Sequence, residues 1–162
     1  MHKADYTFSF EVFDSIDELA EEDAFLLNEA KKATAHSYAP YSRFRVAAVA
    51  KLANGKIISG TNQENASYPA GICAERVLLS TASSLYLQVA IETIAISYHN
   101  ENGESDHPVS PCGICRQSLQ EYEQRLKSPI RLVLGGMKGK IYIIPHSSLL
   151  MPLAFTNTEL KK

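Results

Sequence analysis

The segments Cys73-Ala74-Glu75-Arg76 and Pro111-Cys112-Gly113-Ile114-Cys115 contain all three cysteines of the chain, and the fold has to bring them together. Three thiolates can hold one zinc ion and leave its fourth coordination position open, an arrangement typical of catalytic zinc sites. Glu75 stands two residues after the first cysteine. A carboxyl group at that distance can handle protons for whatever binds at the open position.

The positions of the cysteines relative to predicted helices support this interpretation. Cys112 and Cys115 lie on one side of the first turn of a helix predicted from about Pro111 to Leu126. Cys73 directly precedes a second helix, predicted over residues 74–88. Unpaired N–H groups at helix starts lower the pKa of a nearby thiol and favour the thiolate. Arg76 adds a positive charge that can donate hydrogen bonds to a thiolate sulfur.

The alternative is a structural zinc site, which normally has four protein ligands. The fourth ligand would have to be a histidine brought in by folding, from the set His36, His99, His107 and His146. None of these stands at a ligand spacing from a cysteine, so the sequence favours the open site.

The remaining pattern alternates strands with helices. Ser15 and Glu18 form a capping-box pair at the start of a helix predicted over residues 16–36. Asn54-Gly55 is the favoured two-residue turn of a hairpin. Strands are predicted at residues 44–52, 56–60, 91–96, 130–134 and 140–144, and residues 1–13 read as an edge strand or an extended arm. This order predicts a three-layer α/β/α sandwich with a mixed central sheet of about five strands.

The bulk composition limits the classes of function. The chain has 162 residues, a single-domain length, and a net charge of −2 with scattered Lys and Arg, which argues against binding a nucleic-acid strand. It has no apolar run near the ~18 residues that span a bilayer, and its first residues lack the apolar core of a signal peptide. An odd number of cysteines fits metal binding in a reducing compartment better than a disulfide framework. We therefore expect a cytoplasmic protein with a small-molecule ligand and no membrane partner.

Five motifs stand out in order along the chain: Tyr41-Ser42-Arg43-Phe44-Arg45-Val46, Asn62-Gln63-Glu64-Asn65-Ala66-Ser67-Tyr68, Cys73-Ala74-Glu75-Arg76, Pro111-Cys112-Gly113-Ile114-Cys115-Arg116-Gln117 and Leu150-Met151-Pro152-Leu153-Ala154-Phe155. Through these motifs, from about Tyr38 to Phe155, the chain resembles a small, homotetrameric cytidine deaminase with three cysteine ligands, a member of the cytidine/deoxycytidylate deaminase family. We expect residues 1–162 to form one domain. The resemblance covers a core at 38–155, and the N-terminal arm and first helix at 1–35 match the family only loosely. The chain departs from the family pattern at Ala47, where the family usually has Gly, and at Pro69-Ala70-Gly71, where Gly often follows the tyrosine.

The resemblance implies a role for each matched residue. One Zn²⁺ per chain would be held by the three cysteines, and Glu75 would shuttle protons. Phe44 would pack against the pyrimidine, with Ala74 as a further substrate contact, while Asn62 and Glu64 would bind the sugar hydroxyls. Two residues would reach into the active site of a neighbouring subunit of the homotetramer, namely Tyr68 and Phe155.

The implied reaction is hydrolytic deamination of free cytidine and 2'-deoxycytidine to uridine and 2'-deoxyuridine, a step of pyrimidine salvage. Replacing an amine by oxygen at C4 needs a strong nucleophile at neutral pH, and zinc lowers the pKa of its water to about 7. One carboxylate beside the metal can deliver protons to the ring nitrogen and then to the departing amine. An Asn and a Glu suit a pair of sugar hydroxyls, because one can donate and both can accept hydrogen bonds.

Two other functions share these features. One is deamination of a cytosine-containing nucleoside antibiotic of the blasticidin-S type, which uses the same zinc core. The other is a non-catalytic, zinc-stapled nucleoside-binding module, in which Phe44 would be a core residue, Asn62 a turn former and Glu64 a solvated charge. The intact Glu75 and the missing fourth ligand favour an enzyme over this module.

Overall fold

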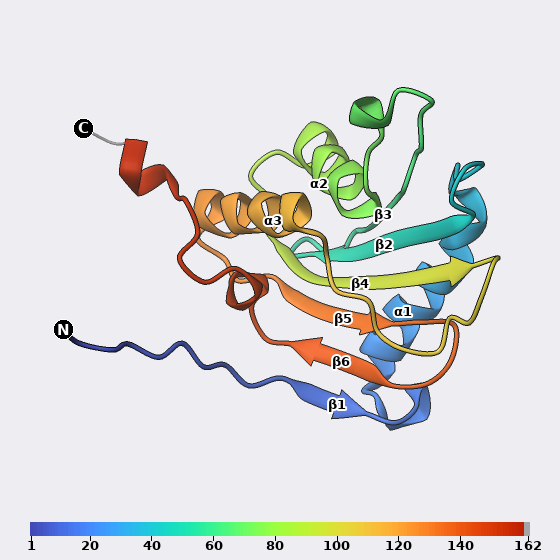
Figure 1. The fold of residues 1–162 in the computed structure, drawn as a ribbon, viewed down its shortest axis with the longest axis horizontal. Helices are drawn as coiled ribbons and strands as arrows, with labels where there is room; N and C mark the ends of the chain where they lie inside the picture. The colour runs from blue at the N-terminus through green and yellow to red at the C-terminus, as the bar shows by residue number, and fades with distance from the viewer. Residues whose placement is uncertain (161–162) are drawn as a thin grey trace.

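A six-stranded mixed sheet forms the middle layer of the molecule (Figure 1). The computed structural model describes residues 1–160. The strand order is β1-β6-β5-β4-β2-β3. Only β4 and β5 pair in parallel, and the other neighbours are antiparallel. The strands are β1 (Glu11–Phe13), β2 (Phe44–Leu52), β3 (Ile57–Thr61), β4 (Ile91–Asn100), β5 (Arg131–Gly135) and β6 (Ile141–Ile144).

The connections follow from the local sequence. Asn54-Gly55 makes the predicted turn between β2 and β3, with Gly55 at a positive φ of 79°. Asn54 accepts a hydrogen bond from the backbone N–H of Lys56 through its side-chain oxygen, which closes the turn. β4 and β5 run parallel because a helix crosses between them, as a parallel pair requires.

Helices cover both faces of the sheet, which confirms the predicted three-layer sandwich. Figure 1 shows α1 (Glu21–Ala33) behind the sheet and α2 (Ala74–Leu85) and α3 (Gly113–Leu126) in front of it. Successive residues of a strand point to opposite faces, so the nearly continuous apolar runs of the central strands supply both cores. The core behind the sheet includes Leu26, Leu27, Val49, Ala95 and Val133, and the core in front includes Leu78, Leu119, Ile94, Ile96 and Leu132.

The sheet has six strands instead of about five, because the end of the N-terminal arm pairs with the free edge of β6. In this pairing Val12 lies opposite Tyr142. The segment before β1 is extended and carries the exposed aromatic residues Tyr6, Phe8 and Phe10. Residues 1–13 therefore contain both predicted features, because an extended arm is followed by a short edge strand.

Several element boundaries differ from the predicted ones. The first helix begins at Glu21, not at residue 16, because the capping pair caps only a 3₁₀ turn at Ile16–Glu18. Leu19 then takes an extended conformation with ψ of 154°, which interrupts the helical path. α1 ends at Ala33 and a 3₁₀ turn continues to His36. The second and third helices begin and end within three residues of their predicted limits, and β4 continues to Asn100 because β2 pairs with it over its whole length.

Helix α2 packs unusually close to strand β3 at Gly60. A Cβ atom at Gly60 would lie 2.4 Å from the backbone nitrogen of Leu78 and 2.5 Å from the carbonyl oxygen of Ala74. Only glycine permits this approach, since real Cβ atoms do not come so near to backbone atoms. The position of the first turn of α2 over the sheet therefore depends on Gly60.

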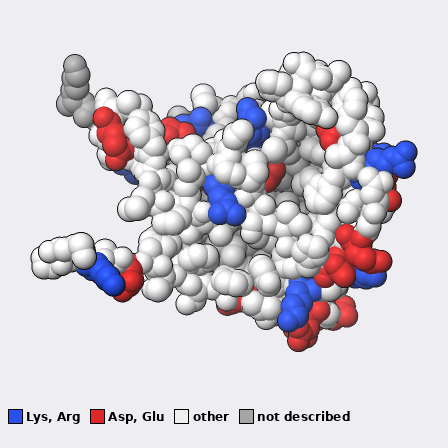
Figure 2. All heavy atoms as spheres, in the orientation of Figure 1, with Lys and Arg blue, Asp and Glu red and all other residues white. Residues whose placement is uncertain are grey.

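The face with α2 and α3 carries few charges. Figure 2 shows Lys and Arg on this face as scattered side chains, with one mixed group of acidic and basic residues at the lower right. Within residues 1–160, none of the helices has the length and hydrophobicity needed to cross a lipid bilayer.

Candidate active site

The three cysteines meet where α2 and α3 begin. Cys73 is the N-cap residue of α2, Cys112 is the N-cap residue of α3, and Cys115 lies in the first turn of α3. Their Sγ atoms all lie within 4.8 Å of one another. The Sγ atom of Cys112 is 3.8 Å from that of Cys73 and 3.5 Å from that of Cys115. The predicted convergence of the two segments is confirmed.

This donor set fits one zinc ion. Zn–S bonds of about 2.3 Å in tetrahedral geometry place sulfur atoms about 3.8 Å apart, close to the separations in this cluster. Within residues 1–160 no histidine or carboxylate joins the three sulfur atoms. The cluster therefore matches the site with an open fourth position and not the structural site with four ligands.

The electrostatics of the cluster also favour a bound cation. Hydrogen bonding with Cys115, and more weakly with Cys112, together with the charge of Arg76 lowers the pKa of Cys73 to about 6, against the opposing effects of burial and of Glu75. The pKa of Cys115 is raised, first by its hydrogen bond to Cys73 and then by burial. Three thiolates so close together repel one another, and a cation between them removes that repulsion. In the described part of the chain no hydrogen bond joins Arg76 to a sulfur atom, so its charge alone acts on the cluster.

Glu75 lies beside the cluster without belonging to it. Its side chain is buried in the first turn of α2, with 5% of the residue exposed. Burial raises the pKa of the Glu75 carboxyl group, while hydrogen bonds from its own backbone N–H and from Cys115 act in the opposite direction. A buried carboxyl group next to metal ligands has the position that proton transfer requires.

A cavity of about 380 Å³ is lined by Glu75, Cys73 and Cys112. This volume lies within the usual range for small-molecule sites. The predicted substrate contacts Phe44, Asn62, Glu64 and Ala74 all line it. The structure thus brings together residues from β2, the loop after β3 and the starts of two helices.

Sequence reasoning missed several residues of the cavity wall. Val46 is two residues beyond Phe44 in β2, so strand periodicity points to it. Ser42 lies in the loop just before β2. The others come from β4 and from the loop before α3, and no sequence spacing links them to the cysteines. The missed residues are Ser42, Val46, Ile96, Tyr98, Val109 and Ser110.

Asn62 connects two segments that line the cavity. Its side-chain amide donates to the carbonyl oxygen of Phe44 at 2.9 Å and accepts from the backbone N–H of Val46 at 2.8 Å. These two bonds join the loop after β3 to the first residues of β2. Part of the hydrogen-bonding capacity of Asn62 is therefore used within the protein.

Glu64 is also oriented by the chain. One of its carboxylate oxygens, Oε2, accepts from the backbone N–H groups of Tyr41 at 2.9 Å and Ser42 at 3.2 Å. Partial desolvation raises the pKa of Glu64, but these bonds and one with the Ser42 side chain outweigh it and hold the pKa below its usual range. Glu64 is therefore a fixed, ionised acceptor at neutral pH.

Tyr68 and Phe155 do not line this cavity in their own chain. Tyr68 is 80% exposed and Phe155 is 59% exposed. Tyr68 begins a 3₁₀ turn made by Pro69 and Ala70, so the departure from the family pattern there forms a short turn on the surface. The other departure, Ala47, is fully buried in β2 and does not line the cavity.

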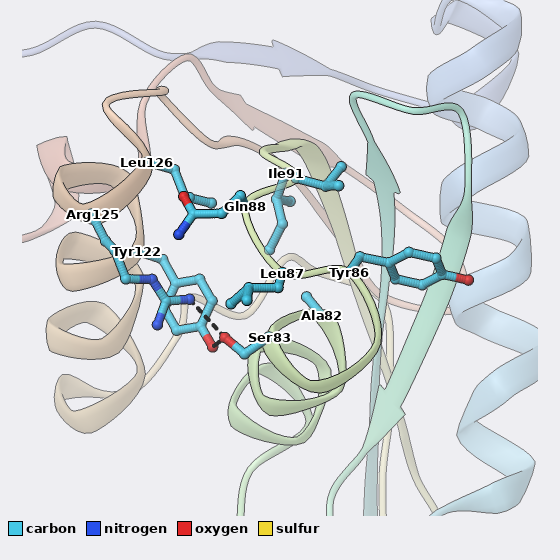
Figure 3. A pocket seen from close by; sticks show the side chains of 10 residues that line it. Ala82, Ser83, Tyr86, Leu87, Gln88, Ile91, Tyr122, Arg125 and Leu126 are labelled. Carbon is cyan, nitrogen blue, oxygen red and sulfur yellow. Dashed lines mark hydrogen bonds between the residues drawn. The ribbon is translucent and has the colours of Figure 1, made fainter.

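A second cavity, of about 60 Å³, lies between the far ends of α2 and α3 (Figure 3). There the hydroxyl group of Tyr122 and the guanidinium group of Arg125 both reach the hydroxyl group of Ser83. Arg125 also lies 4.1 Å above the ring of Tyr122. These contacts fasten the two helices at the ends opposite to the cysteines.

Comparisons with known proteins agree with this geometry. Residues 20–127 match the sequence model of the cytidine and deoxycytidylate deaminase zinc-binding region. The chain is 38% identical over 135 residues to a cytidine deaminase of Halalkalibacterium halodurans, covering 83% of this chain and 95% of that protein. A cytidine deaminase of Sporosarcina psychrophila is 34% identical over the same length, covering 83% of this chain and 92% of that protein.

Solved structures show the same relationship. The fold is similar to the crystal structure of cytidine deaminase from Burkholderia pseudomallei, with a TM-score of 0.71 and 33% identity, covering 85% of this chain and all of that one. The structure from Mycobacterium tuberculosis gives a TM-score of 0.62 at 29% identity, with 81% of this chain and 94% of that chain covered. The family match over most of the chain and the three-cysteine cluster lead to one conclusion: the chain belongs to the cytidine and deoxycytidylate deaminase family of zinc-dependent enzymes.

Proposed function

We propose that this protein hydrolyses free cytidine and 2'-deoxycytidine to uridine and 2'-deoxyuridine, with release of ammonia. One observation carries the proposal. Two residues of the three-sulfur cluster, Cys73 and Cys112, line the same nucleoside-sized cavity as the buried Glu75. A purely structural zinc site would need neither the open position nor the adjacent carboxyl group.

The chain's own residues account for the proton transfers of this reaction. Bound zinc supplies a Lewis acid that lowers the pKa of a water molecule to near neutrality. Glu75 accepts a proton as oxygen bonds to C4, and delivers it to N3 of the pyrimidine ring. It then carries a second proton to the amino nitrogen, which leaves as ammonia as the C4 carbonyl forms. A single carboxyl group serves every transfer because all the atoms involved lie around C4.

The cavity walls orient the substrate in this proposal. The ring of Phe44 packs against the pyrimidine, and Ala74 contacts it at the start of α2. Glu64 uses Oε2 to bind the backbone of residues 41 and 42, which directs Oε1 toward a sugar hydroxyl. Asn62 stands beside it and contributes its remaining donor and acceptor capacity.

We further propose that residues 1–162 work as one domain within a homotetramer. Tyr68 and Phe155 are large aromatic side chains left exposed in the single chain. In the tetramer they would complete the active sites of neighbouring subunits. We also propose a cytoplasmic role in pyrimidine salvage, because free nucleosides are the substrates of that process.

The test is a spectrophotometric assay of the purified protein with cytidine, 2'-deoxycytidine and blasticidin S, with ammonia and zinc measured in parallel. We expect loss of cytidine absorbance, equimolar ammonia and one zinc per chain, with activity lost on chelation. Turnover of the antibiotic alone would replace the proposal by the antibiotic deaminase. One zinc per chain without ammonia from any of the three would favour the non-catalytic binding module.

Glu75→Gln is the matched control for this assay, because it keeps the size and shape of the side chain. It should retain zinc and lose at least about a thousandfold in kcat, since general acid–base catalysis contributes about 10²–10⁴-fold per transfer. Activity close to that of the wild type would refute the proton-shuttle role.

A further inference from the structure

Tyr98 lies in the wall of the active-site cavity, and the proposed reaction assigns it no role. It is a residue of β4, only 3% exposed, and it stands directly opposite Val46 of β2. Its ring stacks on the ring of Phe44, with centroids 4.9 Å apart and an interplanar angle of 14°. Phe44 lines the same cavity, so the two stacked rings form one continuous aromatic surface, called here the aromatic platform.

The hydroxyl end of Tyr98 is held by the loop that leads to α3. The hydroxyl oxygen lies 3.4 Å from Nδ1 of His107, whose ring is edge-on to the tyrosine at 5.9 Å. The same Nδ1 lies 3.0 Å from a carboxylate oxygen of Asp106. A carboxylate can only accept, so the Nδ1 hydrogen is directed to Asp106, and the tyrosine hydroxyl is its second, weaker partner.

The anchoring loop is itself fixed to the sheet. A Cβ atom at Gly139 would lie 1.9 Å from the carbonyl oxygen of Asp106, and one at Gly136 would lie 2.3 Å from that of Ser105. The backbone of residues 105 and 106 therefore rests directly on the turn between β5 and β6. The backbone N–H of Asn100 also donates to the hydroxyl group of Ser105 at 2.9 Å. A loop packed in this way can hold His107 in one place.

The same loop continues into the lining of the cavity. After His107 it supplies Val109 and Ser110, and then the zinc ligand Cys112. Tyr98 is thus in contact with Phe44 on one side and with this loop on the other. Tyr98 therefore connects the Phe44 ring to the loop that leads to Cys112.

We propose that Tyr98 is a positioning residue of the nucleoside pocket, which holds the Phe44 ring against the substrate base and is itself anchored by His107. This inference rests on the proposed function, because it needs a nucleoside in the cavity. Tyr98 makes no contact with the reacting atoms in this role. Its loss should weaken substrate binding and leave the chemical step almost unchanged.

Three variants test the role, with kcat, KM, zinc content and thermal stability measured for each. Tyr98→Leu removes the stacked ring and should raise KM for cytidine about tenfold, the upper value expected for one aromatic pair, with kcat within about threefold and zinc unchanged. His107→Ala should raise KM about threefold without changing stability, since the side chain of His107 is 67% exposed. His99→Ala changes an exposed neighbour on β4 and should leave KM unchanged.

A double variant measures independently whether Phe44 and Tyr98 act together on substrate binding. Phe44→Leu combined with Tyr98→Leu should raise KM by much less than the product of the two single effects, because both remove the same platform. Should Tyr98→Leu fail to fold, His107→Ala still tests the anchor in a stable protein. An unchanged KM in His107→Ala, or a fall in kcat or zinc with KM unchanged in Tyr98→Leu, would overturn the proposal.

Failure of the proposed function would look different. Wild-type protein without cytidine turnover would refute the deaminase function itself. In that case calorimetric binding of uridine and cytidine to the zinc-loaded variants still tests the positioning role. Equal affinity of the wild type and Tyr98→Leu would then refute it.

Discussion

Substitution of Gly60 by alanine should damage catalysis from a position outside the active-site cavity. The new methyl group would lie 2.4 Å from the backbone nitrogen of Leu78 and 2.5 Å from the carbonyl oxygen of Ala74. Both are backbone atoms of α2, so no side chain can rotate to make room. The helix itself has to move away from β3.

The size of the movement follows from the contact distance. An ordinary contact of a Cβ atom begins near 3.4 Å, so the first turn of α2 must shift by about 1 Å. This overpacking should cost about 1–3 kcal/mol of folding stability. The same turn carries Cys73 and Glu75, and a misplacement of about 1 Å at a catalytic group can lower the rate about a hundredfold. We expect kcat for cytidine to fall by about that factor.

The assay compares Gly60→Ala with Gly55→Ala, a control at the tip of the same hairpin. Nothing lies within 4 Å of a Cβ atom at Gly55, but its φ of 79° is unfavourable for alanine. Gly55→Ala should therefore lose about 1 kcal/mol of stability through backbone strain and keep its kcat. Urea unfolding gives the stability of each variant, and initial rates at saturating cytidine give kcat.

The two variants separate loss of stability from loss of geometry. Equal destabilisation with a large kcat loss only in Gly60→Ala would support the reasoning. A Gly60→Ala protein with wild-type kcat and zinc content would refute it, because α2 would then tolerate the shift or never make it.

Three further predictions follow from individual contacts. Glu123 accepts bonds from the backbone N–H groups of Ile130 and Ser147 and from the Ser147 hydroxyl, so Glu123→Ala should cost about 3 kcal/mol in urea unfolding. Glu123→Gln keeps an acceptor oxygen and should cost about 1 kcal/mol, and equal costs would contradict this account. Cys115→Ser should lower zinc well below one per chain by atomic absorption, with a matching loss of activity, and full zinc retention would exclude Cys115 as a ligand. Phe155→Ala should raise KM for cytidine about tenfold with zinc unchanged if the site is shared between subunits, and an unaltered KM would oppose a shared site.

Local sequence was sufficient to predict the two halves of the metal site, while the packing of α2 and α3 brings the halves together. Cys112 and Cys115 are three residues apart at a helix start, and Glu75 is two residues from Cys73, so their relations depend on only one helical turn each. The hairpin at Asn54-Gly55 was predictable for the same reason, since turn chemistry is local. The start of α1 was predicted wrongly because the capping pair at Ser15 and Glu18 serves a 3₁₀ turn, which has the same sequence signal as a helix.

Tertiary structure decided the features that depend on distant segments. No sequence spacing places Tyr98 against Phe44, because the antiparallel register of β4 on β2 sets that contact. The close approach of α2 to Gly60 and the sixth strand β1 on the edge of β6 likewise arise from packing between elements. By itself, the sequence determined which atoms can bind zinc and carry protons, since those are properties of residue type and local spacing. The pocket around them was decided only by the fold, because its walls are surfaces of strands and loops that packing alone brings together.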